Sequence, residues 1–381
     1  ECQGWQTIVM LILAPIAILA AMVLLAWSSN KERIAEANAS ATCAIVAGLT
    51  CTSIQTISIL QSIEVKWMEP LQSAINAVSL LGFDIKIIGA GCLFDGGAGT
   101  FILRQLVAPL LAAWLLLIAL LRKRLNLQPH LELSVHFANS AGSLCMLVFI
   151  SIVLSGVMPL ICYRHPGEAG ESMTTAPEVL CFDSHVHWTM VAAGMAGLTC
   201  VPVPFFVLIL WATLRYPSFV RMSQMSNGLQ LRRLMFLFRR FEPHGYFYGA
   251  LLLTRGLLIC LVPVIFRDNV PANLLLLAAI LMFFVTVQNI IRPWRGSLAN
   301  ALDTIINGLI ILVLFCGALS HTDAQYLEST ISAFAHLCLI LFLLVLAVSF
   351  TVALVQYTRP SPYYHRFVCH HKADAAAQAR F

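Results

Sequence analysis

The chain has 381 residues, of which 59% are hydrophobic and only 11% are charged, and its mean hydropathy is +0.84. Soluble globular proteins carry about 25% charged residues, and a soluble fold of this composition would have a largely apolar surface. The composition therefore excludes a cytoplasmic enzyme, a nucleic-acid-binding protein and a secreted disulfide scaffold. It indicates an all-α polytopic membrane protein whose apolar side chains face lipid.

Nine segments are long and apolar enough to be membrane-spanning helices, since a span needs about 20 mostly apolar residues. The second of them is the most polar, because it contains several Ser, Thr and Gln residues. We expect spans at 5–27, 42–63, 101–121, 138–161, 188–214, 246–266, 272–291, 298–319 and 329–357. Residues 1–357 then form one transmembrane domain, and 358–381 form a cytoplasmic tail.

The distribution of charge predicts the orientation of these helices. With the N-terminus outside, most of the 23 Lys and Arg residues fall on the inner side, and most of the acidic residues fall on the outer side. This separation agrees with the positive-inside rule. It predicts outer loops at 64–100 and 163–187 and a C-terminus inside. It also implies that the partners are membrane lipids with anionic inner-leaflet headgroups rather than nucleic acid.

Of the twelve cysteines, most lie within the expected spans, where a thiol is usually a small apolar side chain. Cys92, Cys162 and Cys181 are expected on the outer side, and they could supply one disulfide bond if that side is oxidising. The sequence does not determine the pairing. A bond to Cys181 would fasten the 163–187 loop to a helix end.

The inner segment 215–245 is predicted to contain an interfacial amphipathic helix. Leu231, Leu234, Met235, Phe238 and Phe241 fall on its apolar side, and Arg232, Arg233, Arg239 and Arg240 fall on its other side. Two interpretations remain open. The helix is either an orientation anchor with its arginines at lipid phosphates, or a lipid-sensing or gating linker between the fifth and sixth spans. The aromatic residues 246–248 that follow are expected at the membrane interface, as is Trp294.

Polar side chains within spans are energetically expensive and are therefore candidates for function. On the eighth span, Asn300, Asp303 and Asn307 form one polar stripe, and Arg255 of the sixth span lies at a comparable depth. We predict a buried ion pair between Arg255 and Asp303. Such a pair could simply lock two helices together, or it could act as a gate latch or line a permeation path.

The polar second span supplies further candidates. Gln55 and Gln61 could face a hydrated cavity, or they could form ordinary hydrogen bonds between helices. His185 and His187 lie beside Cys181 and could contribute to a metal site, but no second cluster completes four ligands, so we expect no metal and no cofactor. Because no catalytic motif is present, we expect that the protein is not an enzyme.

Several of these residues occur in an order that resembles a known family. The residues concerned are 232–243, 246–248, Arg255, 291–294, Asn300 and Asp303, preceded by Gln61, Trp67, Pro70 and Cys92. Over about residues 55–320 they resemble the C-terminal membrane domains of large protist cysteine-rich surface proteins, described as transient-receptor-potential-like or polycystin-like. The resemblance implies a channel-like or sensory role in the plasma or ciliary membrane, and an extracellular cysteine-rich region or partner protein.

Two features bear on that resemblance. Cys2 precedes the first span and the chain does not begin with Met, so we expect it to be part of a longer protein. A conventional channel of this class has six spans and a pore loop between the fifth and the sixth. Here nine spans are expected, and the basic 215–245 segment is expected inside, where it cannot be that pore loop.

Three functional hypotheses follow. A channel-like or sensory protein is favoured by the polar stripe, the polar second span and the basic linker. A non-conducting receptor or structural membrane anchor requires no pore. A lipid or small-molecule transporter would use the two outer loops as lids, although no internal repeat supports it. The sequence leaves the oligomeric state open.

Overall fold

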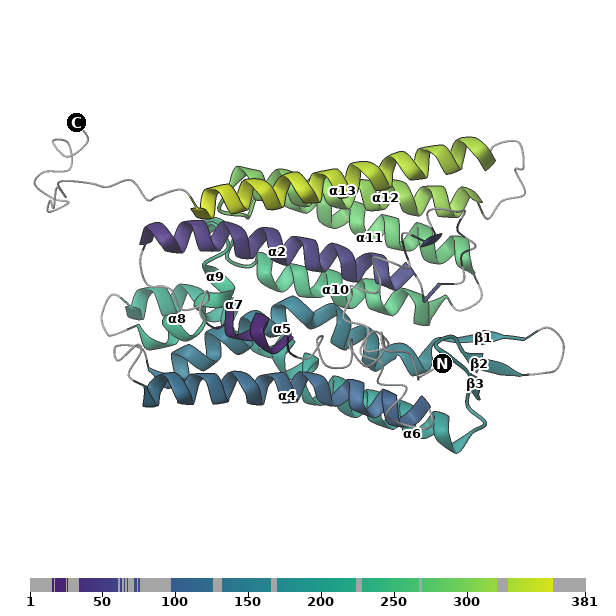
Figure 1. Cartoon of the computed structure of the whole chain (residues 1–381), viewed down its shortest axis with the longest axis horizontal. Helices are drawn as coiled ribbons and strands as arrows, with labels where there is room; N and C mark the ends of the chain where they lie inside the picture. Colours follow the sequence, from purple (N-terminus) through teal and green to yellow (C-terminus); the bar gives the residue numbers. More distant parts are fainter. Residues whose placement is uncertain are drawn as a thin grey trace, which may run out of the picture.

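The computed structural model describes residues 34–60, 97–125, 132–165, 170–223, 228–266, 269–320 and 328–358, and parts of 16–26 and 62–75. The long helices lie side by side along one common direction (Figure 1). They are α2 (Ile34–Leu60), α4 (Gly97–Arg124), α5 (Leu133–Val157), α6 (His185–Cys200), α7 (Pro202–Ser223), α10 (Tyr248–Ile265), α11 (Val270–Ile291), α12 (Ser297–Ser320) and α13 (Glu328–Thr358).

Short elements occupy the two ends of this bundle. One end holds the 3-10 helix η3 (Met158–Leu160) and the strands β1 (Cys162–Arg164), β2 (Glu171–Met173) and β3 (Ala176–Leu180). The other end holds α8 (Leu229–Arg233), α9 (Met235–Phe238) and the 3-10 helix η4 (Pro243–Gly245). We call these two regions the sheet end and the linker end (Figure 1).

Seven helical segments among the described residues are long and apolar enough to cross a membrane. They are Ala98–Arg124, Leu133–Leu160, His185–Arg221, Tyr248–Ile265, Val270–Ile291, Ser297–Leu319 and Ile331–Val352. They coincide with the third to ninth expected spans, and they fit an integral multi-pass membrane protein. The expected span 5–27 and the tail 358–381 lie largely outside the described residues. The expected span 42–63 corresponds to α2, whose shorter apolar part is Ala44–Leu60.

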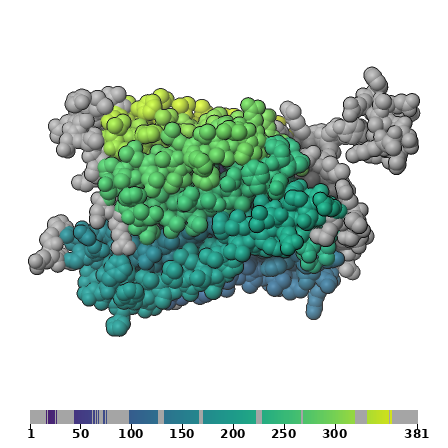
Figure 2. Space-filling view, turned by 180° about the vertical axis from the view of Figure 1, so that it is seen from behind, coloured from purple at the N-terminus to yellow at the C-terminus, as the bar shows by residue number. Residues whose placement is uncertain are grey.

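Large apolar side chains cover much of the outer surface of the bundle. Leu214 of α7 is 81% exposed, Ile290 of α11 is 78% exposed and Phe350 of α13 is 65% exposed. Figure 2 shows one face of the bundle, on which α6 and α7 (teal) lie beside α10 to α12 (green). Apolar surface on this scale is unfavourable in water and favourable against lipid chains, which agrees with the composition.

Helix α5 lies at the centre of the bundle and packs against α2, α4, α6 and α10. Small residues allow the close approach. A Cβ added at Gly142 would lie 2.4 Å from the ring of Phe236, and one added at Gly194 of α6 would lie 2.5 Å from the backbone oxygen of Gly156. Close backbone approach of this kind is typical of helix packing in membranes, where dispersion and hydrogen bonds replace the hydrophobic effect.

The fifth span, predicted at 188–214, is longer in the structure and is interrupted. Its helix breaks at Val201, whose φ and ψ are −120° and −69°, directly before Pro202. Proline disfavours helical geometry at the preceding residue and cannot donate a backbone hydrogen bond. Together α6 and α7 run over His185–Arg221, about 55 Å at 1.5 Å per residue. Helix α7 therefore occupies the first part of the segment 215–245 that was expected to be a separate linker.

The expected outer loop 163–187 contains an ordered antiparallel sheet, which the all-α expectation did not include. The strand order is β1-β2-β3, with Cys162 opposite Met173 and Ser172 opposite Leu180. The strands are only three to five residues long, so they carry too little alternation to be recognised in the sequence. In the other expected outer loop, 64–100, α4 already begins at Gly97, and most of the remainder lies outside the described residues.

Candidate functional site

The segment 215–245 does not contain the single amphipathic helix that was expected. Its first part belongs to α7, and from here on the linker means residues 228–247, which lead from α7 to α10. It is interrupted at Leu234, where φ and ψ are −102° and 13°, between α8 and α9. Leu234, Phe238 and Phe241 are all buried, and they belong to the main apolar core of the protein. The expectation of an apolar face against lipid is therefore wrong for these residues. An apolar stripe looks the same in a sequence whether it packs on lipid or on neighbouring helices.

The four linker arginines occupy different environments. Arg232 is exposed, whereas Arg233 donates a hydrogen bond to Ser134 Oγ at 3.1 Å. Arg239 and Arg240 are partly buried. Burial, with the neighbouring charge of Arg239 added to it, lowers the pKa of Arg240 to about 10, so this guanidinium is still charged at pH 7.

The end of the linker pairs with the turn that precedes α12. The backbone N–H of Glu242 donates to the oxygen of Pro293 at 2.8 Å, and that of Arg295 donates to the oxygen of Arg240 at 3.2 Å. Phe241 and Trp294 face each other in an isolated antiparallel bridge. These contacts join segments about 50 residues apart and fix the position of Trp294.

The predicted ion pair between Arg255 and Asp303 is present. Arg255 Nη1 lies 3.6 Å from Asp303 Oδ1, and the two side chains are 5% and 2% exposed. The other carboxylate oxygen, Oδ2, accepts hydrogen bonds from Trp294 Nε1 at 2.9 Å and from Tyr248 Oη at 3.4 Å. Asn307 Nδ2 donates to Oδ1 at 2.6 Å. The buried carboxylate is thus surrounded by donors from α10, α12 and the turn at 293–295.

The other residues of the polar stripe hold the turn in place. Asn300 Nδ2 donates to the backbone oxygen of Trp294 at 2.9 Å, and Asn300 Oδ1 accepts from the backbone N–H of Trp294 at 3.3 Å. Gln288 of α11 donates from Nε2 to the backbone oxygen of Asn300 at 3.0 Å. Asn300 therefore acts on Asp303 indirectly, by positioning Trp294, whereas Asn307 contacts the carboxylate itself.

Tyr248 and Trp294 are the residues of this site that sequence reasoning assigned elsewhere. Both were expected at the membrane interface, yet they are only 1% and 4% exposed. Their rings and that of Phe241 lie with centroids 5.0 to 6.0 Å apart, and Tyr248 and Trp294 both donate to Asp303. A buried Tyr or Trp needs an acceptor for its polar hydrogen. The acidic Asp303 within a span was therefore the feature of the sequence that could have indicated a buried position for these two residues.

A cavity of about 40 Å³ adjoins the ion pair between α2, α5 and α10. This volume is sufficient for a few water molecules. Most of its wall is apolar, and its polar lining residues are Thr52, Gln55, Arg240, Arg255 and Trp294. Gln55 also donates from Nε2 to the backbone oxygen of Leu147 at 3.0 Å, which joins α2 to α5. Gln61 lies outside the described residues.

The sheet end contains the other candidate cluster. Cys162 and Cys181 form a disulfide bond, one of the pairings that the sequence allowed, while Cys92 lies outside the described residues. His187 Nδ1 accepts from the backbone N–H of Phe182 at 3.1 Å, and Nε2 lies 2.9 Å from the backbone oxygen of Pro159. Both sulfurs and both ring nitrogens of His187 therefore already have partners within the chain.

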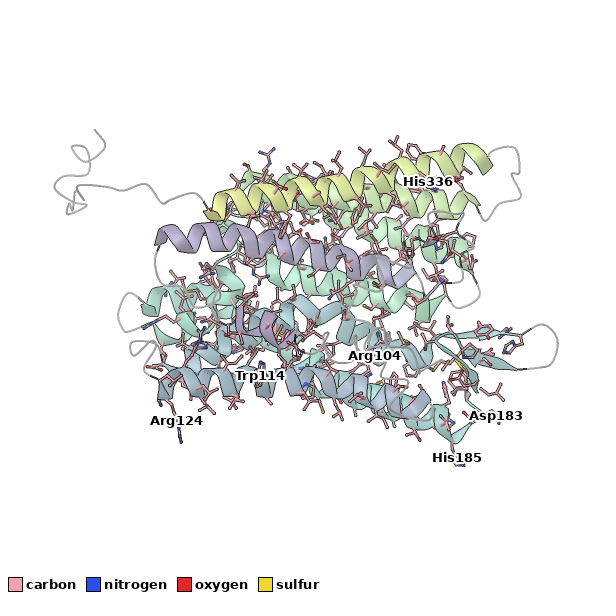
Figure 3. All side chains as sticks on the ribbon, viewed as in Figure 1. Arg104, Trp114, Arg124, Asp183, His185 and His336 are labelled. Atoms are coloured by element: carbon pink, nitrogen blue, oxygen red, sulfur yellow. A yellow bond between two sulfur atoms is a disulfide. The ribbon has the colours of Figure 1, made fainter. Side chains whose placement is uncertain are left out.

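His185 differs from His187 in being exposed at the tip of α6. Figure 3 shows it beside Asp183 at the sheet end, while Arg124 lies at the opposite end of the bundle. His336, on α13, is partly buried, with Nδ1 3.4 Å from Ser332 Oγ. These positions do not bring further histidines to the Cys162–Cys181 bond.

Comparisons of the chain with protein-family models, with curated proteins and with solved structures find no match.

Proposed function

We propose that the chain is a channel-like or sensory multi-pass membrane protein, and that it is the membrane domain of a larger surface protein of the protist cysteine-rich type. The proposal includes nine spans, an N-terminus outside, a C-terminus inside and a location in the plasma or ciliary membrane. The observation that supports it is the buried pair of Arg255 and Asp303, which lies beside a cavity with several polar side chains on its wall and is joined to the linker through Trp294.

The connectivity of Asp303 favours a latch over a simple helix contact. Its carboxylate is bonded to α10 through Arg255 and Tyr248, and to the turn at 293–295 through Trp294. That turn is in turn paired with the linker. A displacement of the linker would therefore break bonds to a charge that is expensive to leave unpaired. Two-state switches use contacts of this kind, because a partly broken buried network is unfavourable.

Electrical recording of the reconstituted full chain tests this proposal. Wild-type protein is expected to carry current under membrane stretch, voltage or ligand. Asp303→Asn keeps the size of the side chain and removes its charge, so it is expected to shift the stimulus needed for opening. Asp183→Asn is the matched control, because Asp183 is exposed at the sheet end. A wild-type protein that is silent under every stimulus would contradict a channel.

A non-conducting receptor or structural anchor is the second candidate function. It is favoured by the aromatic cluster of Phe241, Tyr248 and Trp294, in which Tyr248 and Trp294 both donate to Asp303. In that case wild type and Asp303→Asn are both silent, and the variant changes only stability or partner binding. A lipid or small-molecule transporter is less well supported, because the cavity beside the pair holds about 40 Å³.

A further inference from the structure

Arg240 differs from Arg255 in its surroundings, although both line the same cavity. Arg255 has Asp303 as its acidic partner. No acidic side chain pairs with Arg240 in the ranges that the structure describes, and no acidic residue lines the cavity there. A Cβ added at Gly48 would lie 3.6 Å from Arg240 Nη1, so the guanidinium lies directly against α2.

The charges around the cavity do not balance. Two guanidinium groups, of Arg240 and Arg255, face a single carboxylate, that of Asp303. Arg239 raises the positive potential further, since its charge is one of the causes that lower the pKa of Arg240. An excess positive charge in a partly buried site is expensive unless an anion accompanies it. A negative charge bound in this cavity would therefore offset the excess positive charge.

Hydrogen-bond donors are also in excess. Each guanidinium carries five N–H donors in a planar fork, the geometry that binds phosphate and carboxylate oxygens in pairs. Arg255 directs Nη1 toward Asp303, and the Asp303 carboxylate already accepts from Trp294, Tyr248 and Asn307. Among the side chains that line the cavity, Thr52 and Gln55 offer one acceptor oxygen each, which is fewer than the N–H donors of Arg240 and the remaining donors of Arg255.

We propose that this cavity, between Gly48, Arg240 and Arg255, binds a compact anion of the phosphate class. Its volume of about 40 Å³ admits a small anionic group and excludes a nucleotide or a sugar phosphate as a whole. The phosphate group could come from inorganic phosphate or from the exposed monoester headgroup of phosphatidic acid. The proposal goes beyond the function proposed above, because binding here does not require that the protein conducts.

Thermal unfolding of the purified full chain in neutral detergent with phosphatidylcholine tests the proposal. Inorganic phosphate is titrated at constant ionic strength against gluconate, and phosphatidic acid is titrated separately against phosphatidylcholine. A ligand that binds only the folded state raises the unfolding temperature in a saturable way. Saturation with inorganic phosphate identifies a free anion as the source, and saturation with phosphatidic acid alone identifies the lipid headgroup.

Four variants locate the effect. Arg240→Gln removes a cavity charge, and Gly48→Val fills the cavity while leaving both arginines in place. Each is expected to weaken the apparent affinity at least tenfold. Arg232→Gln is the control for charge, because Arg232 lies on the same linker but is exposed. Gly48→Ala is the control for the helix, because its added Cβ makes only an ordinary 3.6 Å contact.

The proposal is overturned if neither titration gives saturable stabilisation of the wild-type protein. It is also overturned if Arg232→Gln weakens the response as much as Arg240→Gln, since that would be a general effect of charge. If Arg240→Gln does not fold, Gly48→Val decides the question, because it keeps both arginines. An undiminished response in Gly48→Val would then place the anion elsewhere. None of these results depends on whether the protein carries current.

Discussion

The two ends of the bundle are closed in different ways. At the sheet end, a disulfide bond joins Cys162 and Cys181, which are 19 residues apart. At the linker end, the buried Asp303 joins Arg255, Tyr248 and Trp294 through non-covalent contacts, which can break and re-form. A covalent bond between two nearby segments of the chain fixes one arrangement of them. A polar network between distant segments can exist in two arrangements. Movement linked to function is therefore expected at the linker end.

Among changes at the two ends, removal of the Asp303 carboxylate is expected to have the largest effect on stability. Asp303→Ala leaves Arg255 buried without its counter-charge and leaves Trp294 Nε1 without its acceptor. Removing one partner of a buried ion pair leaves the other charge uncompensated, which destabilises proteins by about 3–5 kcal/mol. We expect a lower yield of folded protein and a large fall in unfolding temperature, measured by thermal unfolding in detergent.

A double variant separates the charge from the packing. Asp303→Leu combined with Arg255→Met replaces the pair by apolar side chains, which in other proteins is often neutral or stabilising. The double variant is expected to be more stable than Asp303→Ala. Equal loss in the two would mean that packing, rather than charge pairing, dominates this site.

Loss of the disulfide bond is expected to have the next largest effect. Cys162→Ser opens a loop whose closure accounts for about 3 kcal/mol in the chain-entropy model. The damage should be confined to the sheet end, with hydrogen exchange increasing in β1–β3 and the start of α6. Cys200→Ser is the control, because Cys200 is a free and exposed cysteine. Increased exchange at Trp294 in Cys162→Ser would show that the two ends are coupled.

The sequence predicted the helices well because each long apolar run is a local signal. The third, fourth and sixth to ninth expected spans begin and end within a few residues of their helices. The ion pair was also predictable, since Arg255 and Asp303 are the charged residues placed well within those runs. A charge in such a run needs a partner, and few partners are available.

The features that the sequence did not predict depend mostly on contacts between distant segments. The apolar stripe at Leu234 and Phe238 was assigned to lipid, but these residues pack on other helices of the protein. Trp294 was assigned to the interface, because nothing in its own segment reveals the bridge to Phe241. The sheet at 162–180 was missed because its strands are short, and its disulfide could be narrowed only to three cysteines.

A smaller change within the linker end removes one hydrogen bond to the Asp303 carboxylate and keeps the aromatic packing around it. Trp294→Phe keeps the aromatic packing on Phe241 and removes the 2.9 Å hydrogen bond to Asp303. Hydrogen bonds to charged groups contribute about 1.5–3 kcal/mol, so we expect a loss of about 2 kcal/mol in unfolding free energy. Trp211→Phe is the matched control, because Trp211 lies 44% exposed on α7. Equal losses in the two variants would contradict the role of the Nε1–H donor.

The smallest effect is expected at an exposed ion pair of the sheet end. Arg164 Nε lies 2.9 Å from Glu171 Oε1, closer than the atoms of the buried pair, but the Arg164 side chain is 71% exposed. Solvent screening limits such pairs to about 0–1 kcal/mol, so Arg164→Ala should change the unfolding temperature little, and less still at high salt. Asp303→Ala should keep its effect at high salt, because the buried carboxylate is screened much less. If salt reduces both effects in parallel, the buried pair is hydrated, and the network at the linker end is weaker than its contacts indicate.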